Sequence, residues 1–171
     1  AHRDFTLDAI GWDPRTRAAI DPHGGGEDLA AHRLRAVGRP EHRLAEDPLR
    51  ALRAARIAAE LGLEVDPALE AALPGSAAAL GTLSGERIGA ELLRLLSCGN
   101  PGPGLALLRR SGLESALVPQ VREDALRVID ALPRDRELRL AAWLRGSPVA
   151  SLLARWRVAR ARRAEVETLL A

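Results

Sequence analysis

The apolar residues of this chain are almost all Leu, Ala, Val and Ile, and this feature limits the folds open to it. Apolar residues make up 47% of the sequence, whereas aromatic residues make up only 2%. A core with so few aromatic rings must be built from aliphatic side chains, and Ala and Leu are strong helix formers. The sequence therefore predicts a mainly α-helical fold with a sizeable buried core.

Start and stop signals divide most of the chain into short helices. Asp47 and Pro48 suit the N-cap and the first position of a helix over residues 49–61, which Gly62 is expected to end. Other helices are expected over residues 66–73, 84–96, 105–111, 125–132, 137–144, 148–156 and 161–170.

Two glycine-rich segments mark boundaries between parts of the chain. Gly24–Gly26 is expected to be a hinge at the end of the first 27 residues, which differ from the rest and include a short strand at Ala18–Ile20. Asn100–Gly104 is the clearest break. These signals predict three parts: residues 1–27 as the edge of a mixed α/β domain, residues 28–99 as a helical unit and residues 100–171 as a second helical unit.

The composition argues against secreted, membrane and metal-cluster proteins. Cys98 is the only cysteine, which suits a reducing cytosol and therefore a cytoplasmic protein; we expect its side chain to be buried. No apolar run approaches the length of a membrane span. The net charge of +2 does not by itself indicate nucleic-acid binding. All of the basic residues are arginines, which bind phosphates and base edges in a bidentate way.

Asp47 and Arg50 together have the chemistry to read a base edge. Residues three apart on a helix share a face. The carboxylate can accept from an exocyclic amino group while the guanidinium donates to a ring nitrogen, a pattern that cytosine and adenine both offer. Uracil and guanine present the opposite pattern, which leaves buried polar groups unsatisfied. The plainer alternative is that Asp47 is only a helix cap and Arg50 a surface arginine.

Further arginines admit both a binding and a structural interpretation. Arg53 and Arg56 follow Arg50 along the helix and either bind the nucleotide or form a solvated face with salt bridges to Glu46 and Glu60. Near the C-terminus, a second basic stretch either contacts RNA phosphates or is a solvated helix face. Its RNA-binding candidates are Arg160, Arg162 and Arg163.

Four segments, in this order, resemble motifs of class II tRNA nucleotidyltransferases, the family of CCA-adding enzymes and bacterial poly(A) polymerases. They are Arg3-Asp4-Phe5-Thr6-Leu7-Asp8-Ala9; Asp21-Pro22-His23-Gly24-Gly25, followed by Asp28-Leu29; Glu46-Asp47-Pro48-Leu49-Arg50-Ala51-Leu52-Arg53-Ala54-Ala55-Arg56; and Glu86-Arg87-Ile88 through Glu91-Leu92. The first departs from the family pattern twice, because His2 stands in the place of an arginine and Asp8 in the place of an asparagine.

The resemblance implies the fold and a role for each part. Residues 1–27 would be the C-terminal remnant of the α/β head, residues 28–99 the nucleotide-selecting helical neck, and residues 100–171 the helical body that contacts tRNA. The implied function is template-independent addition of C and/or A to the 3′ end of tRNA, with CTP and ATP as substrates. The implied partners are the tRNA 3′ end and acceptor arm, with no membrane.

The resemblance also implies the site residues. Arg3 and Asp4 would contact the nucleotide and its ribose, although a salt bridge at the chain end is the alternative. Asp47 and Arg50 would read the base. Arg53 and Arg56 would reach the triphosphate or the base, while Glu46, Glu86 and Arg87 would support the loop that presents the nucleotide helix.

Catalysis by the family needs Mg2+, which the resemblance assigns to carboxylates of the head upstream of residue 1. We therefore expect no catalytic or metal-binding residue in this chain and no activity from it alone. Three alternatives remain at this point: poly(A) polymerase or an enzyme adding only CC or only A; a non-catalytic helical RNA-binding module; and a helical protein–protein adaptor.

Overall fold

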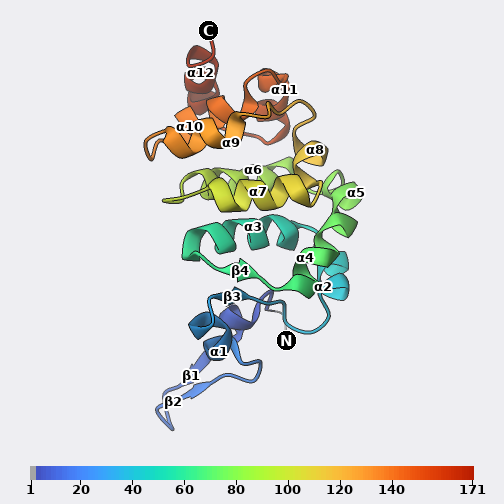
Figure 1. Cartoon of the computed structure of the whole chain (residues 1–171), viewed down its shortest axis with the longest axis vertical. Helices are drawn as coiled ribbons and strands as arrows, with labels where there is room; N and C mark the ends of the chain where they lie inside the picture. The colour runs from blue at the N-terminus through green and yellow to red at the C-terminus, as the bar shows by residue number, and fades with distance from the viewer. Residues whose placement is uncertain (1–2) are drawn as a thin grey trace.

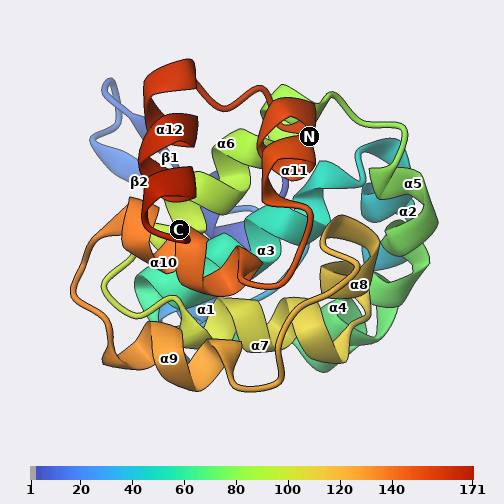
Figure 2. The ribbon, with the colours of Figure 1, turned by 90° about the horizontal axis from the view of Figure 1, so that it is seen from above.

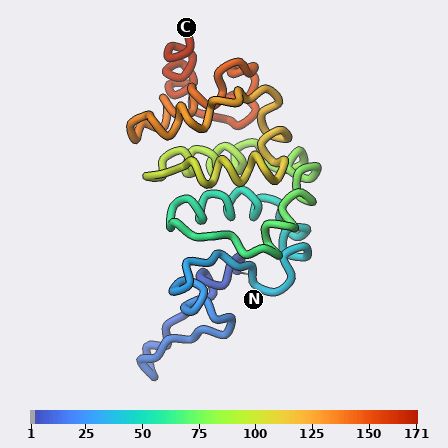
Figure 3. Tube along the Cα trace, in the orientation of Figure 1, coloured from blue at the N-terminus to red at the C-terminus, as the bar shows by residue number. Residues whose placement is uncertain are grey.

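The helices stack in successive layers along the long axis of the molecule (Figures 1 and 3). This computed structural model describes residues 3–171, so His2 lies outside the described part of the chain. A β-hairpin and α1 form one end of the stack, and the C-terminal helix forms the other. The mainly helical fold with a small N-terminal α/β part is confirmed.

The N-terminal half contains the strands and the central helix. Its elements are η1 (Thr6–Ala9), β1 (Gly11–Asp13), β2 (Ala18–Ile20), α1 (Gly25–Ala30), β3 (Arg33–Leu34), α2 (Pro40–Glu46), α3 (Leu49–Leu61) and β4 (Glu64–Val65). The second half is helical throughout. It comprises α4 (Pro67–Ala72), η2 (Leu73–Ser76), α5 (Ala77–Leu80), α6 (Gly85–Leu96), α7 (Gly102–Arg110), α8 (Leu113–Leu117), α9 (Ala125–Ala131), α10 (Arg136–Leu144), α11 (Val149–Arg155) and α12 (Arg160–Thr168).

Short ladders fasten the N-terminal segment to the central helices. β1 and β2 form an antiparallel hairpin in which Trp12 faces Ala19. β3 pairs in parallel with β4, with Leu34 opposite Val65, and Phe5 forms an isolated bridge with Ala36. Since β4 directly follows α3, these pairings bring the start of the chain against the helix that carries the candidate site.

The buried side of α3 carries mostly small side chains, which allows the backbones of other helices to approach it closely. Its buried alanines are Ala51, Ala54, Ala55, Ala58 and Ala59. α7 crosses this face at Gly104, where an added Cβ would lie 2.5 Å from the carbonyl oxygen of Ala55. α6 packs against α3 beside α7, so the buried side of α3 is in close contact with two helices.

One predicted helix has the expected bounds and another does not. α3 spans Leu49–Leu61 as predicted, with Pro48 rather than Asp47 at the N-cap, although the Asp47 carboxylate still accepts from the Leu49 amide at 3.2 Å. α7 begins at Gly102, inside the segment predicted as a break. Proline is compatible with a first helical turn, and a Cβ on Gly102 would lie 2.3 Å from the carboxylate of Asp130, an exposed side chain that can move away.

The glycine segment predicted as a hinge is instead a packed helix start. Gly25 and Gly26 lie in the first turn of α1, and their amides donate to the Asp21 carboxylate at 2.8 Å. A Cβ on Gly25 would lie 2.2 Å from the Thr6 carbonyl oxygen. Glycine is therefore required here for a close backbone approach.

Some helices were not predicted from the sequence. α2, α5 and α8 are short and follow turns without the usual cap signals. After the helix expected over residues 66–73, the chain continues through the 3-10 turn η2 into α5.

α11 docks against the first turn of α6 through two glycines. A Cβ on Gly85 would lie 1.8 Å from the Arg155 carbonyl oxygen, and one on Gly89 would lie 2.7 Å from that of Trp156. Figure 2 shows α11 and α12 above this layer. Trp156 stacks on Trp143 with ring centroids 6.2 Å apart, and both are buried. Cys98 is buried as predicted.

One apolar core runs through the layers, from Phe5 to Val166. It crosses residues 99–100 without interruption because α7 packs on α3. The division at residues 27 and 99 stays a prediction about roles. In the part of the chain that the structure describes, no helix is long and apolar enough to cross a membrane.

Candidate functional site

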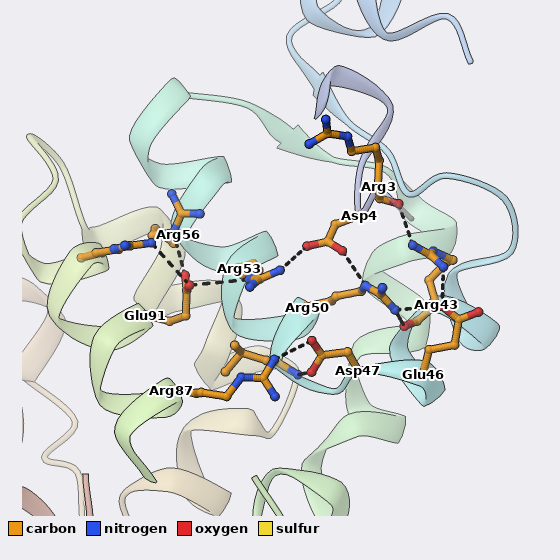
Figure 4. A network of polar contacts seen from close by, with 12 residues as sticks. Arg3, Asp4, Arg43, Glu46, Asp47, Arg50, Arg53, Arg56, Arg87 and Glu91 are labelled. Atoms are coloured by element: carbon orange, nitrogen blue, oxygen red, sulfur yellow. Dashed lines mark hydrogen bonds and ion pairs between the residues drawn. The ribbon is translucent and has the colours of Figure 1, made fainter. Parts of the chain in front are cut away.

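α3 presents a row of three arginines (Figure 4). The row lies on the face of the helix opposite its buried alanines. Arg50, Arg53 and Arg56 are three residues apart, so their side chains follow one another along the helix. Each is bound by a carboxylate from another element. The row is therefore fixed in direction before any ligand arrives.

Asp4 joins the N-terminal segment to this row. Its Oδ1 accepts from Arg50 Nε at 2.6 Å, and its Oδ2 accepts from Arg53 Nη1 at 2.5 Å. The backbone at Asp4 is held because its carbonyl accepts from the Val37 amide at 3.2 Å. Burial alone would raise the pKa of Asp4, but the hydrogen bonds and charges of Arg50 and Arg53 outweigh it and lower that pKa.

Asp8 is a second carboxylate close to this network. Burial raises its pKa, the negative charge of Asp4 raises it further, and the charge of Arg56 opposes both. The residue that departs from the resembling motif is therefore a carboxyl group whose ionisation is opposed by burial and by Asp4.

Glu91 supports the row from α6 and was missed as a site residue. It is buried, and its Oε2 accepts from Arg56 Nε at 2.8 Å, while its Oε1 lies 3.6 Å from Arg53 Nε. The sequence does indicate a special role for Glu91, because this residue follows Ile88 by three positions and so lies on the apolar face of α6. A carboxylate on such a face requires a cationic partner.

Asp47 lies at the junction between α2 and α3. Its Oδ2 accepts from Arg87 Nη2 at 2.7 Å, so α6 fixes the end of this carboxylate. Arg87 is in the first turn of α6, and Glu86 beside it is exposed. Asp47 and Arg50 are thus held by different partners, Arg87 and Asp4, on the same side of the helix start (Figure 4).

Glu46 and Arg43 close the network at the N-terminal end of α3. Glu46 accepts from Arg43, and from Arg50 Nη1 at 3.1 Å. Arg43 Nη2 donates to the Arg3 carbonyl oxygen at 2.7 Å, while the Arg3 side chain is exposed. Arg43 was not predicted as part of the site, since nothing in its spacing connects it with residue 3.

The N-terminal segment is held in place by a separate ion cluster around one buried carboxylate. Asp28 is fully buried and accepts from Thr6 Oγ1 at 2.7 Å and from Arg33 Nε and Arg35 Nε at 2.8 Å each. Burial would raise the pKa of Asp28, but these donors lower it. This cluster fixes η1, and with it the position of Asp4.

The predicted RNA-binding arginines lie apart from this site, on α12 at the far end of the stack (Figure 1). Arg160 is exposed. Arg162 Nε is 2.6 Å from Glu137 Oε1, so part of its charge is neutralised. Arg163 is partly buried, and its Nε is buried with no hydrogen-bond partner.

Within residues 3–171, no group of three or more His, Cys, Asp and Glu side chains is arranged to hold a metal ion. Asp4, the carboxylate nearest the arginine row, is already bound by two guanidinium groups. The described residues therefore do not fit a Mg2+ site.

The chain is similar in sequence to a family model and to known proteins. A family model described as "Probable RNA and SrmB- binding site of polymerase A" matches residues 62–124. The chain is 36% identical to the CCA-adding enzyme of Geobacillus stearothermophilus over 154 residues, which cover 90% of this chain and 35% of the relative. It is 37% identical to the CC-adding tRNA nucleotidyltransferase of Shouchella clausii over 135 residues, covering 78% of this chain and 35% of the relative.

A solved structure is similar over nearly the whole chain. The crystal structure of the Bacillus stearothermophilus CCA-adding enzyme in complex with CTP matches with a TM-score of 0.87 and 33% identity. The match covers 99% of this chain and 45% of that chain. The chain thus spans about a third of the length of the curated relatives described above, at 35% of each.

Proposed function

This chain belongs to the class II tRNA nucleotidyltransferase and bacterial poly(A) polymerase family, and from this we propose that it selects the incoming nucleotide for such an enzyme. The whole activity is template-independent addition of C and/or A to the 3′ end of tRNA. In this proposal residues 1–27 belong to the head, residues 28–99 form the nucleotide-selecting neck, and residues 100–171 form the tRNA-contacting body. The match with a CTP complex supports it.

Asp47 and Arg50 read the base. Cytosine and adenine each present an amino group beside a ring nitrogen acceptor, which a carboxylate and a guanidinium can satisfy together. Uracil and guanine would place a donor against the Arg50 guanidinium and an acceptor against the Asp47 carboxylate. Each group left unsatisfied in this way costs about 1–3 kcal/mol. The observation that supports this most directly is the anchoring of Asp47 by Arg87 and of Arg50 by Asp4, because preorganised groups discriminate better than mobile ones.

Arg3, Asp4, Arg53 and Arg56 contact the rest of the nucleotide. The exposed side chain of Arg3 and the guanidinium of Arg53 bind phosphate oxygens, for which arginine is suited. Asp4 accepts from the ribose hydroxyl in exchange for one of its arginine partners. Glu46, Glu86 and Arg87 are supporting residues, of which Arg87 acts directly on Asp47.

RNA is the second substrate, and α12 contributes to its binding. Arg160, Arg162 and Arg163 supply positive charge at the end of the molecule away from the hairpin. Arg160 is the most available of them, because Arg162 is paired with Glu137. Each phosphate contact adds affinity that falls with salt concentration.

The similarity to a CC-adding enzyme and to a polymerase A family model favours a second candidate within the same family. In that case the enzyme adds only CC or A, or a poly(A) tail. The same base-reading residues serve these activities, and the number of nucleotides added distinguishes them.

Calorimetric titration of this chain with CTP, ATP, UTP and GTP tests the proposal. We expect heat of binding from CTP and ATP, and at least tenfold weaker binding of UTP and GTP, which corresponds to about 1.4 kcal/mol. Equal affinity for all four nucleotides, or no binding of any of them, would contradict a nucleotide-selecting role for these residues.

A further inference from the structure

A polar cavity of about 590 Å³ opens at the C-terminal ends of α3 and α6, outside the site described above. Arg56 and Glu60 line it from α3, and Arg94 lines it from α6. Ser97–Gly99 and Arg134 complete its wall, the latter from the connection between α9 and α10. Segments far apart in the sequence therefore contribute three guanidinium groups to one opening.

Two of these guanidinium groups have capacity for a ligand. Arg94 is 68% exposed, and its ion pair with Glu91 is long, at 3.8 Å. Arg134 is exposed and donates Nε to the Ser97 carbonyl oxygen at 2.9 Å. A guanidinium bound through Nε still carries four other N–H donors, so both arginines can bind phosphate oxygens.

The acidic residues at the cavity reduce its positive charge without removing it. Glu60 Oε2 is 2.6 Å from Arg56 Nη1, and Arg56 also binds the buried Glu91. The charge of Arg56 is thus neutralised by its own partners. Arg94 and Arg134 therefore determine the sign of the net charge in the cavity. Such a modest positive charge matches a singly charged phosphodiester better than a multiply charged free anion.

The wall of the cavity is built before a ligand binds. Arg139 is buried and donates Nη1 to the carbonyl oxygens of Leu96 at 3.1 Å and Cys98 at 2.7 Å. Together with Arg134 it satisfies carbonyl groups at the end of α6, where unpaired acceptors otherwise remain. The position of this wall relative to Arg94 is therefore fixed.

Arg56 connects the cavity with the nucleotide site. It ends the arginine row that begins at Arg50, and it also lines the cavity. The ten residues from Arg50 to Glu60 span about 15 Å of helix. A strand whose end lies at the base-reading residues can therefore place an upstream phosphate at the cavity.

We propose that this cavity binds a phosphodiester group of the RNA strand whose 3′ end is presented to the nucleotide site. Arg94 and Arg134 make the contacts, and Arg139 positions the wall. This inference rests on the proposed function, because it requires an RNA end at the arginine row. It adds an RNA contact on the neck side of the molecule, separate from α12.

The test compares the Arg94→Gln/Arg134→Gln double variant with a matched Arg15→Gln/Arg17→Gln control, which removes the same charge from the exposed hairpin. Fluorescence anisotropy measures binding of a 5′-labelled single-stranded RNA with a free 3′-OH across a range of salt concentrations. We expect the cavity variant to bind on the order of tenfold more weakly, with a salt slope shallower by about 0.7 for the loss of one phosphate contact, and the control to bind as the unmodified chain does.

Calorimetry with CTP and with inorganic pyrophosphate completes the experiment. Unchanged CTP affinity in the cavity variant supports a separate RNA contact. RNA binding equal to that of the control would overturn the inference, as would a loss of pyrophosphate binding without a loss of RNA binding. If the unmodified chain binds neither CTP nor ATP, the proposed function itself fails.

Discussion

The buried carboxylate of Glu91 and the guanidinium of Arg56 form an ion pair between α6 and α3, with 2.8 Å between Oε2 and Nε. The same carboxylate lies 3.6 Å from Arg53 Nε. One acidic side chain therefore orients two neighbouring arginines of the candidate nucleotide site. Its influence on binding is indirect, through the direction in which those arginines point.

Glu91→Gln is expected to weaken CTP and ATP binding while the chain remains folded. The amide keeps the shape of the side chain but loses the charge that orients Arg53 and Arg56, at a cost of about 1–3 kcal/mol in the free energy of unfolding. Calorimetry and urea unfolding measure the two effects. Glu60→Gln is the control, because Glu60 pairs with Arg56 from an exposed position. Restoration of binding by Glu91→Asp, but not by Gln, would identify the charge as the cause, and full binding by Glu91→Gln would refute the positioning role.

Asp47→Ala is expected to weaken both CTP and ATP binding at least tenfold, or about 1.4 kcal/mol. The substitution removes the acceptor for the exocyclic amino group and leaves Arg87 without its partner. Arg87→Gln separates these effects, since it disturbs the anchor and keeps the carboxylate. If the Asp47 variant binds CTP with the same calorimetric affinity as the unmodified chain, this carboxylate does not read the base.

Arg50→Lys is expected to lose nucleotide binding although the charge is preserved. Arg50 donates Nε to Asp4 at 2.6 Å and Nη1 to the Arg43 carbonyl oxygen at 2.5 Å, an arrangement that requires a planar fork. A lysine has one nitrogen and cannot reproduce it. Circular dichroism provides the folding control, and a lysine variant that binds CTP normally would show that charge alone is sufficient.

Gly85→Ala is expected to lower the free energy of unfolding by about 1–3 kcal/mol. The added Cβ would lie 1.8 Å from the Arg155 carbonyl oxygen, so α11 must move away from α6. Gly75→Ala is the matched control, because nothing lies within 4 Å of its Cβ position. Thermal unfolding compares the two, and equal melting temperatures would contradict the close approach.

Asp28→Asn is expected to destabilise the chain at pH 7 by about 2–4 kcal/mol, with a smaller effect in acid. The folded-state pKa of Asp28 is lowered by Arg35, Thr6 and Arg33, so its contribution is present above the unfolded pKa of about 3.9 and is lost as the pH falls through the folded pKa. Urea unfolding of both proteins across this range measures the difference. A difference that stays constant with pH would assign the effect to packing rather than to charge.

The sequence predicts the local elements of this fold better than the contacts between them. Gly62 ends α3 as expected because its φ of +66° is a conformation that glycine adopts readily. The first turn of α7 was missed, since the glycines of residues 100–104 indicate a break when close packing is not considered. Glycines required by a neighbouring backbone, such as Gly104, cannot be recognised from local signals.

The candidate site shows the same limit. Asp47, Arg50, Arg53 and Arg56 were named from their spacing and from the family resemblance, and their role in nucleotide binding stays a prediction. The partners that orient them come from elsewhere in the chain: Asp4 is 46 residues from Arg50, and Glu91 is 35 residues from Arg56. Helical periodicity carries no information about such pairs, because tertiary packing determines them.

The buried alanines of α3 pack so closely against neighbouring helices that α3 has no space to shift on that side. Its backbone is in close contact with α7 at Gly104, where the carbonyl oxygen of Ala55 occupies the place of a side chain. Close-packed interiors resist sliding between such elements. If one site is to accept both a pyrimidine and a larger purine, the difference in size must therefore be accommodated by the position of the nucleotide against the anchored side chains of Asp47 and Arg50, on a backbone that stays where it is.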